Sequence, residues 1–349
     1  MAEPSISLAC RNYDGTNAII RGALRVPGIN LKVNEVNDVV KMFSGMFKGE
    51  YDVAEMSLAE MIYYLTRDRC DFIGIPVFPS RLFRHSFVLC NRRAGIRGPE
   101  DLTGKNIGGL RWVQTAFIWL RGMLVDEHHL SAKDANWYVS ALHHWHENGA
   151  AEKITPRDGS IVKILTGEGS DEYEMSCRAL VDGKIDVLMT TENRKYDSIA
   201  GHPRVRPLFP NIREAEVSYY KKTGIIPIMH VLVVRRSVVE GYPELPARLF
   251  DLFSKAKKLG REWVRSVPSL NLAWMSQYIE EERAIFDGRD PWAYGLKANF
   301  AALAKFISYC DAQGISARRI TPYDLFAAST WELNEEVELT DCKAVPRSL

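Results

Sequence analysis

Three residues that can bind anions or move protons lie close together in the segment Ile75–Ser86. An apolar run in this segment ends at a proline turn, and Arg81, Arg84 and His85 follow within five residues of one another. Two guanidinium groups supply fixed positive charge, and an imidazole exchanges protons near neutral pH. The segment therefore predicts an anion site with a proton donor beside it. The alternative is that these side chains only satisfy carbonyl groups or face solvent.

Two further clusters combine an apolar run with a polar end. Glu55 and Ser57 lie at the end of the strand-like residues 52–55, and a helix starting near Ser57 would offer backbone N–H groups and a hydroxyl to an anion. Ser57 acting only as an N-cap explains the same pattern. His230 ends the proline-interrupted run Gly224–His230, and it is either a site residue or a hydrogen-bonded core histidine. Three such clusters from distant parts of the sequence indicate one shared cleft.

The elements around these clusters alternate between strand and helix patterns. Near-continuous apolar runs of strand length are typical of strands buried on both faces of a parallel sheet. The first set of elements comprises strands at 5–9, 31–36, 52–55 and 72–78 and helices at 39–47 and 58–67. This rhythm predicts an α/β fold in which crossover helices flank mainly parallel sheets. Open sheets of this kind place ligands at the carboxyl ends of their strands.

A second set of elements follows the turn-rich segment Gly95–Gly108. It comprises strands at 86–91, 106–109, 137–139, 162–165 and 187–190 and helices at 115–125, 172–182, 245–264 and 299–309. The turn-rich segment resembles the start of the second lobe in type II periplasmic-binding-protein folds. That topology predicts a ligand cleft between two lobes, with residues 1–86 and 233–349 in lobe I and residues 87–232 in lobe II. His85 and His230 then flank the two chain crossings.

The composition restricts the classes of partner. The 349 residues carry a formal net charge of only +1, so no global field recruits nucleic acid or an anionic membrane. No segment has the apolar length of a membrane span, and the first ten residues lack the pattern of a secretory signal. Six cysteines without CxxC spacing are typical of reduced thiols. We expect a cytoplasmic protein with a small-molecule partner, neither a nucleic acid nor a membrane partner, and room for homo-oligomer formation.

One histidine-rich segment has a weaker claim to function. Residues His143–Glu147 include three histidines, but adjacent histidines point in different directions, and the Asn148-Gly149 pair that follows favours an exposed turn. The sequence also lacks an HExxH, a GxSxG and a dinucleotide-binding motif.

Several segments together resemble the 4,5-dihydroxyphthalate decarboxylase family. The similarity runs from Ser5 to about Phe326 and is carried by Ser7–Cys10 with Tyr13 and Asp14, Asp52–Leu58, Phe72–Ser86, Gly224–His230 and Pro291–Gly295. The resemblance implies a type II periplasmic-binding-protein fold without a secretion signal. It also implies conversion of an aromatic carboxylate, 4,5-dihydroxyphthalate, to protocatechuate and carbon dioxide, a reaction of phthalate degradation in aromatic acid catabolism.

The resemblance also suggests substrate-binding residues, with two departures from the family pattern. Of the run Gly109–Gln114 and the helix after it, only Gln114 and Thr115 match, and Thr190–Arg194 replaces an expected Ala-Arg-Pro-like run. Tyr294 lies in one of the matching segments. We therefore expect substrate contacts from Ser57, Gln114, Thr115 and Tyr294, with the identity of the aromatic acid left open.

Decarboxylation of an arene needs an acid catalyst, because direct loss of carbon dioxide would leave a costly aryl carbanion. A hydroxyl ortho or para to the carboxylate allows the ring carbon to be protonated first. Histidine suits this proton transfer, and arginine suits a carboxylate that stays on the ring. We therefore expect Arg81 or Arg84 to anchor a carboxylate. His85 or His230 then protonates the ring, and Glu55 orients a histidine or a phenol.

Three alternatives stay open at this point. We predict no cofactor, but a divalent metal held by His85, His230 and Glu55 is a compatible variation, because imidazoles and a carboxylate are suitable ligands. The rival to an enzyme is a non-catalytic protein that binds or senses aromatic carboxylates, since a fold does not determine function. A decarboxylase for a different hydroxybenzoate is the third reading.

Overall fold

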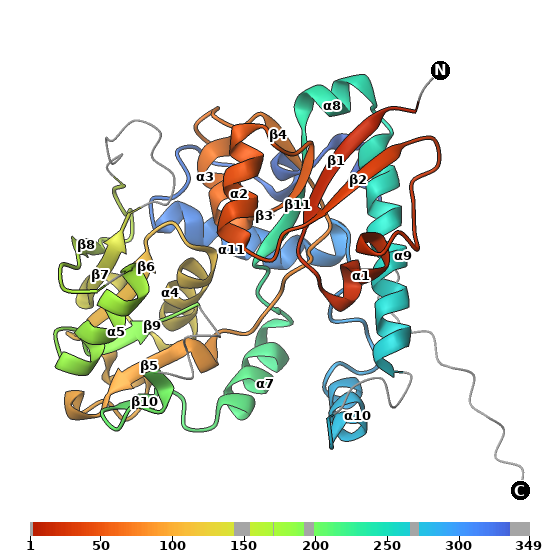
Figure 1. Ribbon diagram of the computed structural model, residues 1–349. Coiled ribbons are helices and arrows are strands. Elements are labelled where there is room, and N and C mark those ends of the chain that lie inside the picture. The colour runs from red at the N-terminus through yellow and green to blue at the C-terminus, as the bar shows by residue number, and fades with distance from the viewer. Residues whose placement is uncertain (1–2, 143–153, 170, 192–198, 266–271, 336–349) are drawn as a thin grey trace, which may run out of the picture.

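The computed structural model describes residues 3–142, 154–169, 171–191, 199–265 and 272–335. The segment His143–Glu147 and residues 192–194 of the altered run Thr190–Arg194 lie outside these ranges. The described chain forms two sheets, each flanked by helices, and the chain passes between them twice (Figure 1).

The first sheet has five strands in the order β2-β1-β3-β11-β4. Their bounds are β1 (Ser5–Cys10), β2 (Asn30–Glu35), β3 (Val53–Ser57), β4 (Phe72–Ile75) and β11 (His230–Arg235). The second sheet has six strands in the order β10-β5-β9-β6-β7-β8. Their bounds are β5 (Val88–Asn91), β6 (Asn106–Arg111), β7 (Asn136–Ala141), β8 (Ile161–Ile164), β9 (Val187–Met189) and β10 (Val205–Pro207).

The helices pack on both faces of the sheets. The described ones are α1 (Asp14–Ile20), α2 (Val39–Lys48), α3 (Leu58–Leu65), α4 (Thr115–His128), α5 (Glu172–Asp182), α7 (Ile212–Thr223), α8 (Arg236–Gly241), α9 (Leu245–Arg265), α10 (Met275–Ile285) and α11 (Phe300–Ala312). In Figure 1, α2 and α3 lie on one side of the first sheet and α9 on the other. Helix α4, which follows β6 of the second sheet, packs against α3 and α11 and so joins the two halves.

Each sheet is mainly parallel, as the alternating pattern predicts, with one strand reversed. Strand β11 runs antiparallel to both β3 and β4, and β5 runs antiparallel to both β9 and β10. These are the strands that follow the two chain crossings. The lobe boundaries at 86/87 and 232/233 stay a prediction, although each falls beside one of these reversed strands.

The first crossing is longer than the sequence pattern predicts. The expected strand 72–78 ends at Ile75, because Pro76 has no N–H to continue the ladder. The next strand starts only at Val88, since His85–Phe87 form a 3₁₀ turn. Arg81, Arg84 and His85 therefore lie on irregular chain between the sheets.

Large apolar side chains fill the interior. Among the fully buried ones are Trp112, Trp119, Trp137, Phe117 and Phe306, and this packing is the main source of stability. Within the described residues, no helix combines the length and apolar character of a membrane span.

Candidate active site

Two side chains converge on one buried carboxylate on β3, the middle strand of the first sheet. Glu55 lies on β3 with no solvent exposure, and its Oε1 accepts the hydroxyl of Tyr13 at 2.8 Å and approaches Nδ1 of His230 at 2.5 Å. The β3–β11 register pairs His230 with Ser57 and Leu232 with Glu55. Alternation along the two strands therefore places the Glu55 and His230 side chains on one face of the sheet.

The carboxylate determines the state of the imidazole. An ionised carboxylate only accepts hydrogen bonds, so Nδ1 of His230 must carry a proton. Nε2 is therefore the ring nitrogen of His230 that Glu55 leaves available to a ligand. The His230 side chain is 18% exposed and meets the Phe43 ring edge-on at 5.2 Å between centroids. This arrangement gives an oriented imidazole with access to solvent beside a buried negative charge.

Tyr13 completes the group as a permanent donor. Burial, followed by the nearby charge of Glu55, raises the pKa of the Tyr13 phenol well above its ordinary value, so the hydroxyl keeps its proton. The nearby Ser80 side chain lowers the pKa of the Tyr13 hydroxyl, but this effect is smaller than that of burial. The second carboxylate oxygen of Glu55 is buried and has no hydrogen-bond partner among the described residues.

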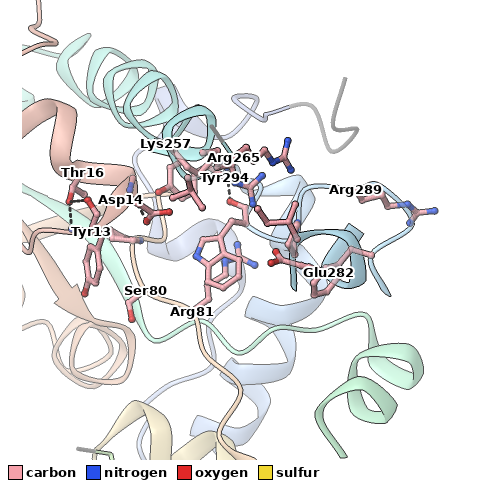
Figure 2. Close-up of a pocket in the computed structure, with 18 of the residues that line it drawn as sticks. Tyr13, Asp14, Thr16, Ser80, Arg81, Lys257, Arg265, Glu282, Arg289 and Tyr294 are labelled. Carbon is pink, nitrogen blue, oxygen red and sulfur yellow. Dashed lines mark hydrogen bonds between the residues drawn. The ribbon is translucent and has the colours of Figure 1, made fainter. Parts of the chain in front are cut away.

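Tyr13 and Ser80 also line a cavity of about 350 Å³. Figure 2 shows these two residues at one end of the cavity and Glu282 and Arg289 at the other. The lining side chains include two carboxylates, Asp14 and Glu282, and six cations, Arg81, Lys257, Arg261, Arg265, Arg283 and Arg289. Lys257 and Arg261 pair with Asp290. The other four arginines still outnumber the two carboxylates, and this local excess of positive charge on a nearly neutral chain favours an anionic ligand.

The two predicted anchor arginines have different surroundings. Nη2 of Arg81 donates to the carbonyl of Ala293 at 3.2 Å and to the side-chain oxygen of Asn299. Nε of Arg84 contacts the sulfur of Met229 at 3.2 Å, and its guanidinium lies over the Phe87 ring at 4.8 Å.

Neither guanidinium has an ion-pair partner among the described residues. Burial lowers the pKa of each to about 10, which leaves both charged at neutral pH. The bonds from Nη2 of Arg81 join the crossing to the 293–299 segment, whereas its buried Nε has no partner among the described residues. Arg84 does not line the 350 Å³ cavity, but it has no oxygen partner among the described residues, so it is the better candidate for a bound anion.

The structure does not bring His85 to Glu55 and His230. His85 is 2% exposed and lies among the rings of Phe83, Phe209 and Tyr219, at 5.0 to 6.5 Å between centroids. Its Nδ1 has no hydrogen-bond partner. Burial, with a smaller contribution from His128, lowers the pKa of His85 to about 4, so the ring is neutral at pH 7.

This burial predicts a stability effect at acidic pH. Because the folded-state pKa of about 4 is below the ordinary value of 6.5, the unfolded chain binds more protons between these pH values. The free energy of unfolding is therefore not reduced by His85 above pH 6.5, where the ring is neutral in both states. It falls by about 3 kcal/mol as the pH falls from 6.5 to 4. Urea unfolding of a His85→Phe variant is expected to show a flatter acid side than the wild type.

Glu216 affects stability with the opposite sign, but it is present in both proteins. The difference between their two pH profiles therefore reports His85 alone. Burial raises the pKa of Glu216 to about 7, so its contribution to stability falls as the pH rises. Parallel profiles for wild type and His85→Phe would contradict a buried neutral His85.

Of three other predicted binding residues, Ser57 and Thr115 join the two halves of the chain, and Gln114 bonds within one half. The hydroxyls of Ser57 and Thr115 bond each other at 2.9 Å, and Thr115 also accepts the N–H of Ala59. Ser57 in addition accepts the N–H of Glu60 as the N-cap of α3. Gln114 donates to Thr191 at 3.1 Å, and its own Oε1 is buried without a partner. None of the three predicted residues lines the 350 Å³ cavity, so their contact with substrate stays a prediction.

Tyr294 does line the cavity, as Figure 2 shows. Its ring lies 4.3 Å from Nζ of Lys257, and its backbone N–H donates to Glu335 at 2.6 Å. Lys257 also pairs with Asp290 at 2.8 Å. These contacts hold the wall opposite Tyr13 in place.

The alternative metal site is not assembled. The described residues contain no group of three or more histidine, cysteine, aspartate or glutamate side chains placed to hold a metal ion. Glu55 and His230 are together, but His85 turns into the aromatic cluster of Phe209 and Tyr219 instead. Within the part of the chain that the structure describes, the three side chains of the ligand set His85, His230 and Glu55 are not grouped as metal ligands.

Tyr13 is the site residue that the sequence reasoning missed. It appeared only as part of a matching segment, since a tyrosine after a short strand has no distinctive pattern. The parallel pairing of β1 with β3 brings the chain after β1 next to Glu55. A prediction that β1 pairs with β3 would have placed Tyr13 near Glu55.

Comparison with known proteins places these residues in context. No protein-family model matches the chain. A 4,5-dihydroxyphthalate decarboxylase from Comamonas testosteroni is 31% identical over 336 residues, which cover 95% of this chain and 99% of the relative. The chain belongs to the 4,5-dihydroxyphthalate decarboxylase family. Another relative of that name, from Pseudomonas putida, is 28% identical over 63% of this chain and 83% of its own length.

Solved structures identify the fold of this decarboxylase family member. The periplasmic aliphatic sulphonate binding protein SsuA from Escherichia coli matches with a TM-score of 0.54 and 12% identity, covering 94% of this chain and 99% of SsuA. The predicted two-lobed, periplasmic-binding-protein-like α/β fold is therefore confirmed. At this identity the similarity establishes the fold alone.

Proposed function

We propose that this protein is a carboxy-lyase that removes one carboxylate from a hydroxylated aromatic acid. The proposed substrate is 4,5-dihydroxyphthalate, and the products are protocatechuate and carbon dioxide. The observation that carries the proposal is the buried Glu55–His230 pair, joined by Tyr13 to a cation-rich cavity, in a chain of the 4,5-dihydroxyphthalate decarboxylase family. A binding protein needs cations for an anion, but it does not need an oriented acid.

His230 is the proposed proton donor. Its imidazolium gives the Nε2 proton to the ring carbon that bears the leaving carboxylate, and a para hydroxyl supplies electron density to that carbon. The carbon–carbon bond then breaks, its electron pair restores the aromatic ring, and carbon dioxide leaves. Glu55 stabilises the imidazolium through Nδ1. Solvent returns a proton to Nε2, which the 18% exposure of the side chain allows.

Arg84 is the proposed anchor for the carboxylate that stays on the ring. A charge-assisted hydrogen bond from a buried guanidinium is strong, and Arg84 has no protein carboxylate that would compete with the substrate. Arg81 contributes positive charge at the cavity wall, while its bonds to Ala293 and Asn299 give it a structural part.

A pair of methionine substitutions separates these two parts. Arg84→Met is expected to raise KM by about 10-fold to 100-fold, because the lost interaction is worth roughly 1.5–3 kcal/mol. Its free energy of unfolding is expected to change by less than about 1 kcal/mol, since an unpaired buried charge is removed. Arg81→Met is expected to lower the free energy of unfolding by about 1–3 kcal/mol, because buried Asn299 loses its donor. Steady-state kinetics and urea unfolding measure both effects, and an unchanged KM in Arg84→Met would remove Arg84 as the anchor.

The substrate proposal is tested with a small panel of acids. Purified protein is mixed with 4,5-dihydroxyphthalate, 4-hydroxyphthalate, phthalate and several hydroxybenzoates, while binding and product formation are followed by calorimetry and chromatography. Phthalate is expected to bind without reacting, since it has the carboxylates but no hydroxyl to assist protonation. Turnover of a different hydroxylated acid alone would change the substrate. Binding of the panel without any product would favour a solute-binding or sensing protein.

A further inference from the structure

We propose that Tyr13 is a positioning residue that keeps His230 a strong enough acid to protonate the substrate ring. The inference rests on the proposed function and deepens it. Tyr13 acts through Glu55, because its hydroxyl and Nδ1 of His230 both bond to the same oxygen, Oε1, at 2.8 and 2.5 Å.

The shared oxygen is the basis of the coupling. Within the described part of the chain Oε2 of Glu55 has no partner, and the two donors compete for the charge on Oε1. A hydrogen bond from Tyr13 disperses part of that charge and weakens the pull of Glu55 on the His230 proton. The imidazolium therefore releases its Nε2 proton more readily, and the rate of proton transfer rises with the strength of the acid.

The position of Tyr13 supports a role beyond folding. Its ring is part of the cavity wall, and Figure 2 shows the side chain beside Ser80 at one end of the cavity. The hydroxyl of Tyr13 is therefore the direct link between the cavity and the Glu55–His230 pair. Ser80 lies beside Tyr13 on the cavity wall, and the Ser80 carbonyl accepts the backbone N–H of His230 at 3.3 Å.

Other titratable groups near this chain are accounted for. Burial, with the charges of Glu55 and Glu35, raises the pKa of Cys10 to about 12, so this thiol is neutral near pH 7. The guanidinium of Arg11 lies 5.7 Å from the centre of the Tyr13 ring. Glu35 accepts a hydrogen bond from Asn37 at 2.9 Å. These groups are the same in wild type and in a Tyr13 variant, so a change between the two reports the Tyr13 hydroxyl.

The experiment compares wild type with Tyr13→Phe, which keeps the ring and removes the hydroxyl. The expected result is a loss in kcat on the order of tenfold, with KM within about twofold because the cavity wall is retained. The alkaline limb of the kcat/KM profile is expected to move to higher pH, because a Glu55 with one donor fewer holds the pair's proton more tightly. The substrate is the same in both measurements, so its own phenol groups do not contribute to the difference.

Two further variants keep the result interpretable. Site-specific 3-fluorotyrosine at position 13 retains the fold and strengthens the donor, so the limb is expected to move to lower pH. Tyr309→Phe is the matched control, because it removes a similar bond, from Tyr309 to Asp126 at 2.7 Å, and its kinetics are expected to equal those of the wild type.

The outcomes are distinguishable. A loss of kcat without a shift of the limb would show a structural role and overturn the inference, as would unchanged kinetics in Tyr13→Phe with an active wild type. A wild type that decarboxylates none of the acids would overturn the proposed function, and this inference with it.

Discussion

A His230→Gln variant is expected to decarboxylate 4,5-dihydroxyphthalate with a kcat lower by about 10²–10⁴-fold. Glutamine is similar in size, and its amide N–H can still donate to Glu55, so the buried carboxylate keeps a partner. The amide has no proton to give to a ring carbon. Stopped-time assays of protocatechuate formation measure the loss, and circular dichroism verifies that the variant is folded.

The control for this variant is His129→Gln. His129 is exposed at the end of α4, beyond its last helical residue, and is expected to be kinetically silent. His85→Gln decides between the two histidines of the sequence-based hypothesis. Loss of turnover in His85→Gln together with normal turnover in His230→Gln would assign the proton to His85 and contradict the mechanism.

A Glu55→Gln variant is expected to show a similarly large effect. In hydrolases with an oriented histidine, replacing the supporting carboxylate by its amide lowers kcat by about 10⁴-fold, because the imidazole takes the wrong tautomer. In this protein the amide would donate to Nδ1 of His230 and leave no negative charge for the imidazolium. We therefore expect a loss of about 10²–10⁴-fold in kcat.

The direction of the pH effect adds a sharper criterion. Loss of the Glu55 charge destabilises the imidazolium, so the alkaline limb of kcat/KM is expected to move to lower pH, opposite to Tyr13→Phe. Asp52→Asn is the matched control, since Asp52 precedes the same strand and accepts two hydrogen bonds from Ser7. A Glu55→Gln enzyme with normal kcat would exclude the carboxylate from the mechanism.

The sequence was sufficient for the architecture and for the two crossings. Proline-interrupted apolar runs at Ile75–Ser86 and Gly224–His230 mark the places where the chain passes between the sheets, and most strands agree with their predicted ranges. The sequence pattern does not predict that β11 runs antiparallel to its neighbours. Alternation of strands and helices does not give the direction of a strand that returns from another lobe. The pairing of Glu55 with His230 depends on that reversal.

The roles of individual residues in the first crossing were harder to predict. The spacing of Arg81, Arg84 and His85 is meaningful on a helix or a strand, but Pro76 and the 3₁₀ turn at His85–Phe87 place them on irregular chain. Their directions depend on distant partners, such as Asn299 for Arg81 and Phe209 for His85. Such partners are set by tertiary packing and have no local signal.

The most direct test of the account is turnover of 4,5-dihydroxyphthalate by the purified wild-type protein, with and without added divalent metal ions. Carbon dioxide and protocatechuate are quantified over time beside the His230→Gln variant. The account predicts equimolar carbon dioxide and protocatechuate in many-fold excess over the protein, and a rate that falls by about 10²–10⁴-fold in the variant. Saturable binding of the acid without either product in every condition would contradict it.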